Sequence, residues 1–261
     1  MTFAFDLISD LHIETWDKFD WTGQATSPVC VIAGDIARTT DLTVDTLKHL
    51  GECYQAVFYI DGNDEHRWGL DDLDQNYKEL SNKIARIRNV VFLRENVVVI
   101  NGVAIVGANG WWSYDFDLNI DAEQCKLSVQ NTYKITGKAI DNISSAGYND
   151  AAYLISSIKK LQTHPDVRSI VVVTHTVPAP WLIEHDIELS DSWRFNTTGN
   201  PHLELALNED SENKIHTWCF GHYHQPVDRI ANGIRYTNNC RGRGDTEWCQ
   251  RPYYPKRIEI K

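Results

Sequence analysis

Short apolar runs and longer helix-like segments alternate along the first part of the chain. Residues 3–8, 29–33 and 56–60 are almost continuously hydrophobic, which is typical of buried strands. Between the second and third runs, residues 41–54 place Leu42, Val44, Leu47 and Leu50 at helical spacing. A strand, a helix and a strand of these lengths predict a right-handed βαβ unit with parallel strands.

The rest of the chain contains further strand and helix patterns. Apolar runs predict strands at residues 90–93, 97–100, 103–107, 169–173, 215–220 and 257–260. Asn101-Gly102 and Asn232-Gly233 predict hairpin turns, the second within a hairpin over 227–237. Helices are expected over 70–88, 121–134 and 149–162, and a long irregular loop over 176–200. Two packed mixed sheets flanked by helices satisfy this pattern, which predicts an α/β fold.

The chain is long enough for one large hydrophobic core. It has 261 residues, and neither a repeat, a low-complexity tract nor a linker interrupts it. We therefore predict a single domain over residues 1–261, with a helical insertion near residues 111–165.

Secretion and membrane insertion both lack a sequence signal. Residues 1–10 show no basic stretch followed by a long apolar region, so no signal peptide is expected. No run approaches the roughly 18–20 apolar residues of a membrane span. The six cysteines form no Cys-x-x-Cys pair, and we interpret them as reduced thiols. These features together predict a cytoplasmic protein without membrane contact.

The net charge restricts the possible partners. The chain has a formal charge of −11, whereas long nucleic acid attracts proteins mainly through its phosphates. The charge therefore argues against long nucleic acid as a partner. A small anionic substrate is compatible with it, because bound metal ions would make an active site locally positive.

Residue types that bind metals follow five of the predicted strands directly. They are Asp10 and His12, then Asp35, Asn63, His175, and finally His222 with His224. In open α/β sheets, ligands bind beyond the carboxyl ends of the strands, so five such ends predict one shared crevice. Each residue alone has an ordinary explanation as a turn or structural residue. Their coincidence is what predicts a metal site.

The chemistry of these residues favours two metal ions. Carboxylates, imidazoles and an amide oxygen suit first-row divalent metals, and Mn, Fe, Zn and Ni all remain open. Seven ligands are too many for one tetrahedral zinc ion. Two cations about 3.5–4 Å apart can bind a phosphoryl group and acidify a shared water.

Five motifs between residues 10 and 224 carry a family resemblance. They are Asp10-x-His12, Gly34-Asp35, Gly62-Asn63, Thr174-His175 and Gly221-His222-x-His224. This ordered set resembles the calcineurin-like metallophosphoesterase superfamily. The resemblance implies a four-layer α/β/β/α sandwich with a dinuclear site on its loops and a metal-bridging hydroxide as nucleophile. It implies two ligand sets that share Asp35: Asp10, His12, Asp35 and His224 for one ion, and Asp35, Asn63, His175 and His222 for the other.

The chain departs from the family pattern at the third motif. The family usually has His directly after the Asn, whereas this sequence has Asp64, followed by Glu65 and His66. In the family that His contacts the phosphate and helps to protonate the leaving group. Three explanations stay open: Asp64 is kept protonated by burial or by sharing a proton with Glu65, His66 replaces the missing imidazole, or the leaving group needs no acid. An ordinary turn role for Asp64 is an equal alternative.

Further residues are candidates for the substrate pocket. Arg38 follows the Gly34-Asp35 motif and is close enough in sequence to reach a phosphate, although a surface ion pair is the commoner role. Asn109, Trp111 and Trp112 follow a predicted strand, in a segment that the resemblance places near the metals in some bacterial members. Tryptophan can stack on a nucleobase or serve as core.

We expect a cytoplasmic, metal-dependent phosphoesterase that acts on a small phosphomonoester or phosphodiester, with a nucleotide among the candidates. One alternative is a nuclease of the same superfamily. Another is a catalytically impaired metal-binding or interaction protein, which the Asp64 departure would explain. The sequence leaves the oligomeric state undecided.

Overall fold

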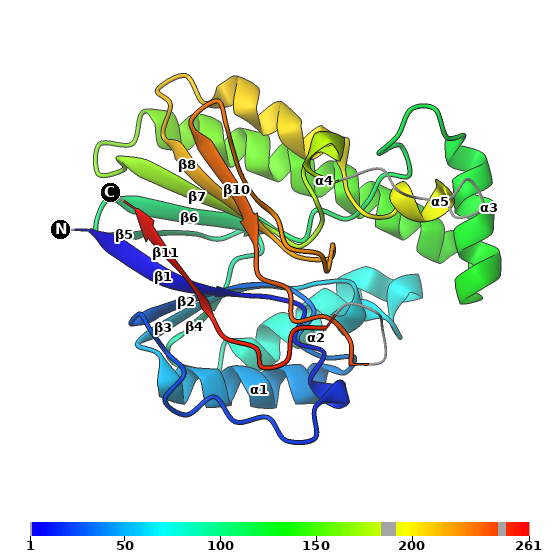
Figure 1. Ribbon diagram of the computed structural model, residues 1–261. Helices are drawn as coiled ribbons and strands as arrows, with labels where there is room; N and C mark the ends of the chain where they lie inside the picture. Colours follow the sequence, from blue (N-terminus) through cyan, green and yellow to red (C-terminus); the bar gives the residue numbers. More distant parts are fainter. Residues whose placement is uncertain (1, 184–191, 245–248, 261) are drawn as a thin grey trace.

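The computed structural model describes residues 2–183, 192–244 and 249–260 and contains two β-sheets (Figure 1). The first sheet has the order β11 (Lys256–Ile260), β1 (Phe3–Ile8), β2 (Val29–Ala33), β3 (Ala56–Ile60) and β4 (Val90–Phe92). The second has the order β5 (Val97–Ile100), β6 (Val103–Ala108), β7 (Ser169–Thr174), β8 (Ile215–Phe220), β10 (Ile234–Asn238) and β9 (Asp228–Ala231).

Parallel strands form the centre of both sheets. β1 to β4 run parallel in the first sheet, and β6, β7, β8 and β10 run parallel in the second. Antiparallel partners flank them, with β11 on β1, β5 on β6 and β9 on β10. The carboxyl ends of the parallel strands therefore meet at a common edge within each sheet, which is where the polar motifs begin.

The buried side chains of the second sheet alternate between two cores, as expected for strands covered on both faces. In β7, Val171 and Val173 belong to the core shared with the first sheet. Ile170 and Val172 belong to the core on the opposite face, together with Leu154 of α4 (Gly137–Gln162). This alternation separates an inner layer between the sheets from an outer layer under a helix.

Helices cover the outer faces of the two sheets (Figure 1). α1 (Thr40–Cys53) packs on β3 and β4, and α2 (Leu73–Ile84) packs on β4. α4 packs on β6 of the other sheet, and α3 (Ala122–Tyr133) lies beside it beyond the sheet edge. The predicted α/β/β/α sandwich of two mixed sheets flanked by helices is therefore confirmed. The single domain and its insertion stay predictions.

Side-chain caps define where the helices begin. Thr39, Asp72, Asp121 and Thr136 each accept a hydrogen bond from a backbone amide of the first turn of α1, α2, α3 and α4. α4 begins at residue 137, twelve residues before the predicted start, because the N-terminal half of its buried stripe includes small and polar residues. α2 is shorter than the predicted 70–88.

The predicted loop over 176–200 contains short helical pieces. Pro180–Leu182 forms a 3-10 turn, and Ser192–Phe195 forms the single-turn helix α5. A further 3-10 helix, Pro201–Glu209, was not predicted. Residues 184–191 of the predicted loop lie outside the described residues.

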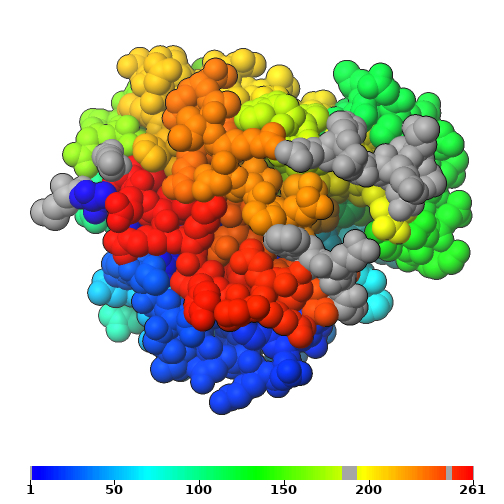
Figure 2. All heavy atoms as spheres, in the orientation of Figure 1, coloured from blue at the N-terminus to red at the C-terminus, as the bar shows by residue number. Residues whose placement is uncertain are grey.

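The two ends of the described chain meet on one side of the molecule. β1 and β11 pair antiparallel, from Phe3 opposite Ile260 to Leu7 opposite Lys256. Figure 2 shows the C-terminal residues, in red, between the blue N-terminal part and the orange β-hairpin. All six cysteines are free thiols. Within the described ranges, no helix combines the length and apolarity that crossing a membrane requires.

Removing a side chain from the inner layer should destabilise both sheets. Ile105 on β6 is fully buried in the shared core, so we expect Ile105→Ala to lower the free energy of unfolding by about 2–5 kcal/mol. Val97 on the edge strand β5 is 40% exposed, so Val97→Ala should change it by less than about 0.5 kcal/mol. Denaturant unfolding of both variants measures the difference. Equal losses would contradict the assignment of Ile105 to the inner layer.

Candidate metal centre

All seven predicted metal ligands lie together where the two sheets meet. Asp10 and His12 follow β1, Asp35 follows β2, Asn63 follows β3, His175 follows β7, and His222 and His224 follow β8. Within each sheet, backbone hydrogen bonds join neighbouring strand ends. Asp10 N donates to Gly34 O at 3.0 Å, and Gly221 N donates to His175 O at 2.8 Å.

One group of ligands contains Asp10, His12 and His224. The Nε2 atom of His224 lies 3.3 Å from Asp10 Oδ1 and 3.3 Å from His12 Nε2. Asp10 also accepts hydrogen bonds from His222 N at 3.0 and 3.2 Å, which fix its carboxylate. The ligand atoms of the three residues all lie within 4.8 Å of one another.

The second group contains His175, Asn63 and His222, and Asp35 connects it to the first. His175 Nε2 lies 3.1 Å from Asn63 Oδ1 and 3.4 Å from Asp35 Oδ1. Asp35, His175 and His222 also place ligand atoms within 4.8 Å of one another. The other carboxylate oxygen, Asp35 Oδ2, lies 3.8 Å from His12 Nε2. Asp35 therefore has one oxygen on each side, as a bridging ligand requires.

Outer hydrogen bonds orient two of the imidazoles. The Nδ1 atom of His175 lies 2.9 Å from Ala33 O, and the Nε2 atom of His222 lies 3.0 Å from Thr197 O. Each carbonyl accepts from one ring nitrogen and so selects the tautomer whose other nitrogen can accept. Such outer partners orient metal ligands in many metalloproteins.

The ligand-bearing turns have an unusual backbone conformation. Asp10, His12, Asp35 and His222 have φ values of 51°, 45°, 53° and 61°, in the left-handed region that residues other than glycine rarely adopt. Such residues cost on the order of 1–3 kcal/mol each and persist where the surrounding structure enforces them. The sharp turns let successive strand ends direct their side chains into one small volume.

Buried charge is the observation that tests whether metal ions fit here. Burial, followed by the negative charges of Asp64 and Asp10, holds the pKa of Asp35 well above its usual range. Burial lowers the pKa of His222 to about 3, with the neighbouring His175 as the next cause. Imidazoles that stay neutral have a lone pair to offer, and a cation would relieve the clustered carboxylates. The donor set fits two divalent ions, whose identity stays open.

Asp64 lies beside the ligands and is surrounded by cationic groups. Its backbone amide donates to Asp35 Oδ1 at 2.8 Å, and its Oδ2 accepts from Arg243 Nη2 at 2.6 Å. The same oxygen lies 3.4 Å from His12 Nδ1. Burial alone would raise the pKa of Asp64, but the His12 hydrogen bond and the Arg243 charge hold it below its usual range. This environment favours the ionised form of Asp64 over the explanation in which burial keeps it protonated.

Glu65 does not share a proton with Asp64, because its carboxylate binds backbone amides instead. Its oxygens accept from Ile36 N at 2.6 Å and Gly62 N at 2.7 Å, and also from Asp35 N and Ala37 N at 3.2 Å. Glu65 thus joins the loop that carries Asp35 to the loop that carries Asn63. This positioning role was not predicted, because a carboxylate two residues after the Asn of the third motif is only a weak signal.

The structure does not bring His66 into the metal centre. Its Nε2 lies 2.8 Å from Asp61 Oδ2, and its ring packs on Tyr77 with centroids 4.4 Å apart. Asn109 belongs to the same buried cluster, where its side-chain amide donates to Asp61 Oδ2 at 2.8 Å. Both residues support the loops behind the site, whereas the sequence made His66 a candidate acid and Asn109 a candidate for phosphate contact.

Arg38 lies at the side of Asp64 and outside the lining of the cleft. Its Nε is 3.4 Å from Asp64 Oδ2 and 3.2 Å from Glu14 Oε1. The side chain is only half-buried, and the two acidic partners hold it away from the ligands. Arg38 therefore forms ion pairs, which is the commoner of the two roles considered for it from the sequence.

A cleft of about 470 Å³ opens on the metal centre. Trp111 and Trp112, both candidates for substrate contact, line it, and Trp112 stacks on His222 with ring centroids 5.6 Å apart. Trp111 is fully buried and donates from Nε1 to Tyr77 OH at 2.7 Å. The far wall is apolar and comes from α3 and α4, and the rim carries guanidinium groups. The wall includes Val129, Tyr133, Ile135 and Ile143, and the rim includes Arg67, Arg194 and Arg243.

Arg243 is the site residue that the sequence analysis missed most clearly. It follows β10, a strand end that carries no metal ligand, and meets Asp64 across 179 positions of sequence. Asn238, Asn239 and Arg241 precede it closely in the sequence. These three are buried and bind backbone carbonyls instead.

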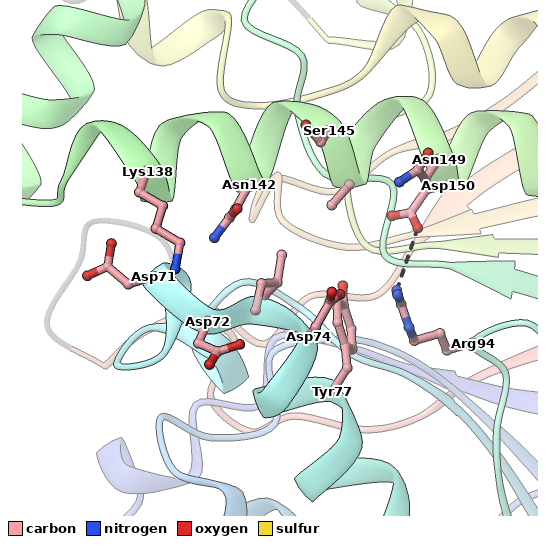
Figure 3. A pocket seen from close by; sticks show the side chains of 12 residues that line it. Asp71, Asp72, Asp74, Tyr77, Arg94, Lys138, Asn142, Ser145, Asn149 and Asp150 are labelled. Carbon is pink, nitrogen blue, oxygen red and sulfur yellow. Dashed lines mark ion pairs between the residues drawn. The ribbon is translucent and has the colours of Figure 1, made fainter.

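A second cavity, of about 290 Å³, lies between α2 and α4 (Figure 3). Figure 3 shows Arg94 pointing to Asp150 of α4, with Nη1 3.8 Å from Oδ1. Asp150 Oδ2 accepts from Gly110 N at 2.8 Å, directly before Trp111. This ion pair fixes the loop behind the tryptophan wall of the first cleft.

Comparison with known proteins supports the same fold. Neither a protein-family model nor a curated protein matches the sequence. Among solved structures, phosphopantetheinyl hydrolase (PptH) from Mycobacterium tuberculosis matches with a TM-score of 0.73 at 18% identity, over 98% of this chain and 95% of that one. A dimetal phosphatase from Danio rerio matches with a TM-score of 0.52 at 13% identity, over 90% and 86% of the two chains.

The chain has the calcineurin-like metallophosphoesterase fold. The strand order, the two mixed sheets and the likeness to these structures agree with the motif resemblance. GAP50, described as the anchor in the inner membrane complex of Plasmodium, also matches, with a TM-score of 0.50 at 12% identity over 95% of this chain and 76% of that one. Enzymes and an anchor thus share the architecture, so the site must decide the function.

A substitution at Gly34 tests whether the turns that carry the candidate ligands must pack as closely as they do. It has φ +85°, and an added Cβ would collide with the His175 ring and lie 2.9 Å from Gly62 Cα. We expect Gly34→Ala to displace His175 and lower the metal content after reconstitution. Gly233→Ala is a matched control, because it has φ +81° but open space around the added atom. Equal metal content in the two variants would contradict the prediction.

The buried Asp150 should make stability depend on pH. Burial, opposed by Arg94 and assisted by the Asp61 charge, raises its pKa from 3.8 to about 7. Between pH 3.8 and about 7, Asp150 keeps a proton in the folded protein that it releases in the unfolded chain. The contribution to stability is therefore complete below pH 3.8 and is lost as the pH rises through about 7.

Asp150→Asn should accordingly flatten the decline of the unfolding free energy between pH 4 and 7. Denaturant unfolding at several pH values, compared with the wild type, measures this difference. Asp166→Asn is the control, because that side chain is exposed. An unchanged slope in Asp150→Asn would show that this carboxyl does not carry the effect.

Proposed function

We propose that this chain is a hydrolase that cleaves a small phosphate ester with two divalent metal ions. The observation that carries the proposal is the Asp35 carboxylate, which has one oxygen 3.4 Å from His175 Nε2 and the other 3.8 Å from His12 Nε2. One ion would be held by Asp10, His12, Asp35 and His224, and the other by Asp35, Asn63, His175 and His222. Bound ions would supply Lewis-acid polarisation of the phosphate and acidify a water molecule.

The protein's own residues would position the ester and exclude water. The phosphate would lie at the ligand end of the cleft, beside Asn63 and His224, and the organic group against the tryptophans and the α3–α4 wall. A volume of about 470 Å³ suits a small molecule. Long nucleic acid would need an extended basic surface, which the net charge of −11 disfavours.

The similarity to PptH suggests one particular ester for testing. That protein is described as a phosphopantetheinyl hydrolase, and the match extends over nearly the whole of both chains. The apolar wall and cationic rim of the cleft are compatible with a phosphodiester that has a long organic arm. We therefore propose three candidate substrate classes: phosphopantetheinyl esters, mononucleotides and cyclic nucleotides.

A reconstitution screen tests the proposal. The metal-free chain is loaded separately with Mn, Fe, Zn or Ni, the metal content is measured, and hydrolysis of nitrophenyl phosphate, bis-nitrophenyl phosphate and the candidate esters is followed. We expect two ions per chain and activity that Asp35→Asn lowers by about 10²-fold or more, a size typical for losing an electrostatic stabilising group. Asp228→Asn, on the surface beside Arg235, should retain activity.

Two other results would identify the alternatives. Digestion of linear and circular DNA with manganese would favour a nuclease. Two bound ions without hydrolysis of any ester would favour a metal-binding interaction protein, in agreement with the use of this fold by an anchor.

A further inference from the structure

Asp64 stands where the family has an imidazole, and the structure surrounds it with guanidinium groups. Arg243 Nη2 lies 2.6 Å from its Oδ2, Arg38 Nε lies 3.4 Å from the same oxygen, and Arg67 Nη1 lies 3.7 Å from its Oδ1. We propose that Arg243, held in place by Asp64, is the group that binds the substrate phosphate where an imidazole is missing. This inference rests on the proposed phosphoesterase function.

The backbone before Arg243 is attached to the loop that supplies the first metal ligand. Arg241 N donates to Ser9 O, and Gly242 N donates to Asp10 O, both at 3.1 Å. Gly242 has φ +81°, a left-handed conformation that lets the chain turn directly after this attachment. Arg243 is therefore positioned by the metal centre's own scaffold.

Arg241 and Arg243 have different roles although they are close in sequence. The Arg241 side chain is buried, donates from Nη1 to Leu11 O at 3.1 Å, and lies over the Trp16 ring at 4.3 Å. It stabilises the segment. Arg243 instead lines the cleft together with Asp35, Asn63 and His224. Only Arg243 of this pair can meet a phosphate held at the ligands.

The position of Asp64 brings the Arg243 guanidinium close to the metal ligands. Asp64 N donates to Asp35 Oδ1 at 2.8 Å, so the carboxylate that holds Arg243 is itself fixed to the central metal ligand. An isolated carboxylate here would repel a phosphate. A carboxylate paired with a guanidinium instead offers a planar set of N–H donors, which matches the geometry of phosphate oxygens.

Arg38 and Arg67 are less suited to this role. Glu14 Oε1 lies 3.2 Å from Arg38 Nε and draws that side chain away, and Arg38 does not belong to the cleft lining. Arg67 lines the cleft but is more than 1 Å farther from Asp64 than Arg243 is, at 3.7 Å against 2.6 Å. Arg38 and Arg67 add positive potential to the site, and Arg243 makes the contact with the substrate phosphate.

The Asp64–Arg243 pair contributes to hydrolysis differently from the imidazole that the family has at the position of Asp64. An arginine keeps its proton throughout, so it stabilises negative charge on the phosphate but does not protonate the leaving group. Asp64 is then a positioning residue. Removing its charge should slow hydrolysis of esters with good and poor leaving groups by the same factor, whereas loss of a proton donor would slow the poor leaving group more.

The test uses the metal-loaded full chain with nitrophenyl phosphate and an alkyl phosphate. We expect Arg243→Ala to lower kcat/KM by about 10²–10³-fold and Arg243→Lys by less, because lysine keeps the charge but not the planar donors. Asp64→Asn should lower it by about tenfold for both esters, the size of losing a hydrogen bond to a charged group. The double variant should be no slower than Arg243→Ala, because the two residues act as one unit.

Inorganic phosphate provides a readout that does not depend on turnover. Calorimetric titration should show weaker phosphate binding in Arg243→Ala at unchanged metal content, and added guanidinium at millimolar concentration should restore part of its activity. Arg235→Ala breaks a surface arginine–aspartate pair of similar geometry, with Nη2 2.7 Å from Asp228 Oδ2, and should match the wild type in every assay. Thermal unfolding checks that each variant is folded.

The possible outcomes separate this inference from the proposed function. An active wild type with Arg243→Ala equal to it in phosphate binding and in turnover would overturn the role of Arg243 and leave the phosphoesterase intact. A larger loss for the alkyl ester in Asp64→Asn would overturn the positioning role of Asp64. A wild type that holds two ions but hydrolyses no ester would overturn the proposed function, on which this inference rests.

Discussion

The concentration of buried carboxylates between the two sheets is the constraint on which the rest of the structure depends. Asp10, Asp35 and Asp64 are all buried, and their mutual repulsion raises the cost of ionising Asp35. The fold offsets part of this cost with backbone amides, imidazoles and the Arg243 guanidinium. A pair of divalent cations would offset the remainder of this cost.

The geometry that creates this concentration comes from the strand ends. Four ligand residues sit in left-handed turns, and the glycines beside them allow backbones and side chains to approach more closely than a Cβ would permit. Glu65 then joins two of the loops through four amide hydrogen bonds. The backbone strain and the Glu65 hydrogen bonds that offset it are local to each loop. The clustered ligand residues, in contrast, form only when all the strand ends are in place.

The sequence predicted most of the fold and the residues that gather at the candidate metal centre, because both depend on strong local signals. Continuous apolar runs mark the central strands, and ligand residues directly after such runs must fall at the carboxyl edge of a sheet. The start of α4 was missed because Gly147 and several serines interrupt its apolar stripe. Arg243 could not be predicted, because its role arises from a contact with Asp64 that only the packing of the two sheets creates.

His66 and Asn109 illustrate a second limit of sequence analysis. Both are polar, both lie near a motif, and both serve to hold Asp61 in the interior. A residue type and its distance from a motif cannot distinguish a side chain that faces the cleft from one that faces the loop behind it. That choice depends on backbone turns, such as the one at Asn63–Asp64, which the pattern of apolar residues does not encode.

The pairing of His12 with His224 joins positions 212 residues apart, at nearly opposite ends of the sequence. At synthesis rates of about 5–20 residues per second, a ribosome needs on the order of 10–40 s to make the later residue after the earlier one. During that interval the nascent chain exposes acidic and imidazole groups without their partners. Synthesis of the segment that carries His224, rather than any early folding step, is therefore what permits the candidate metal centre to assemble.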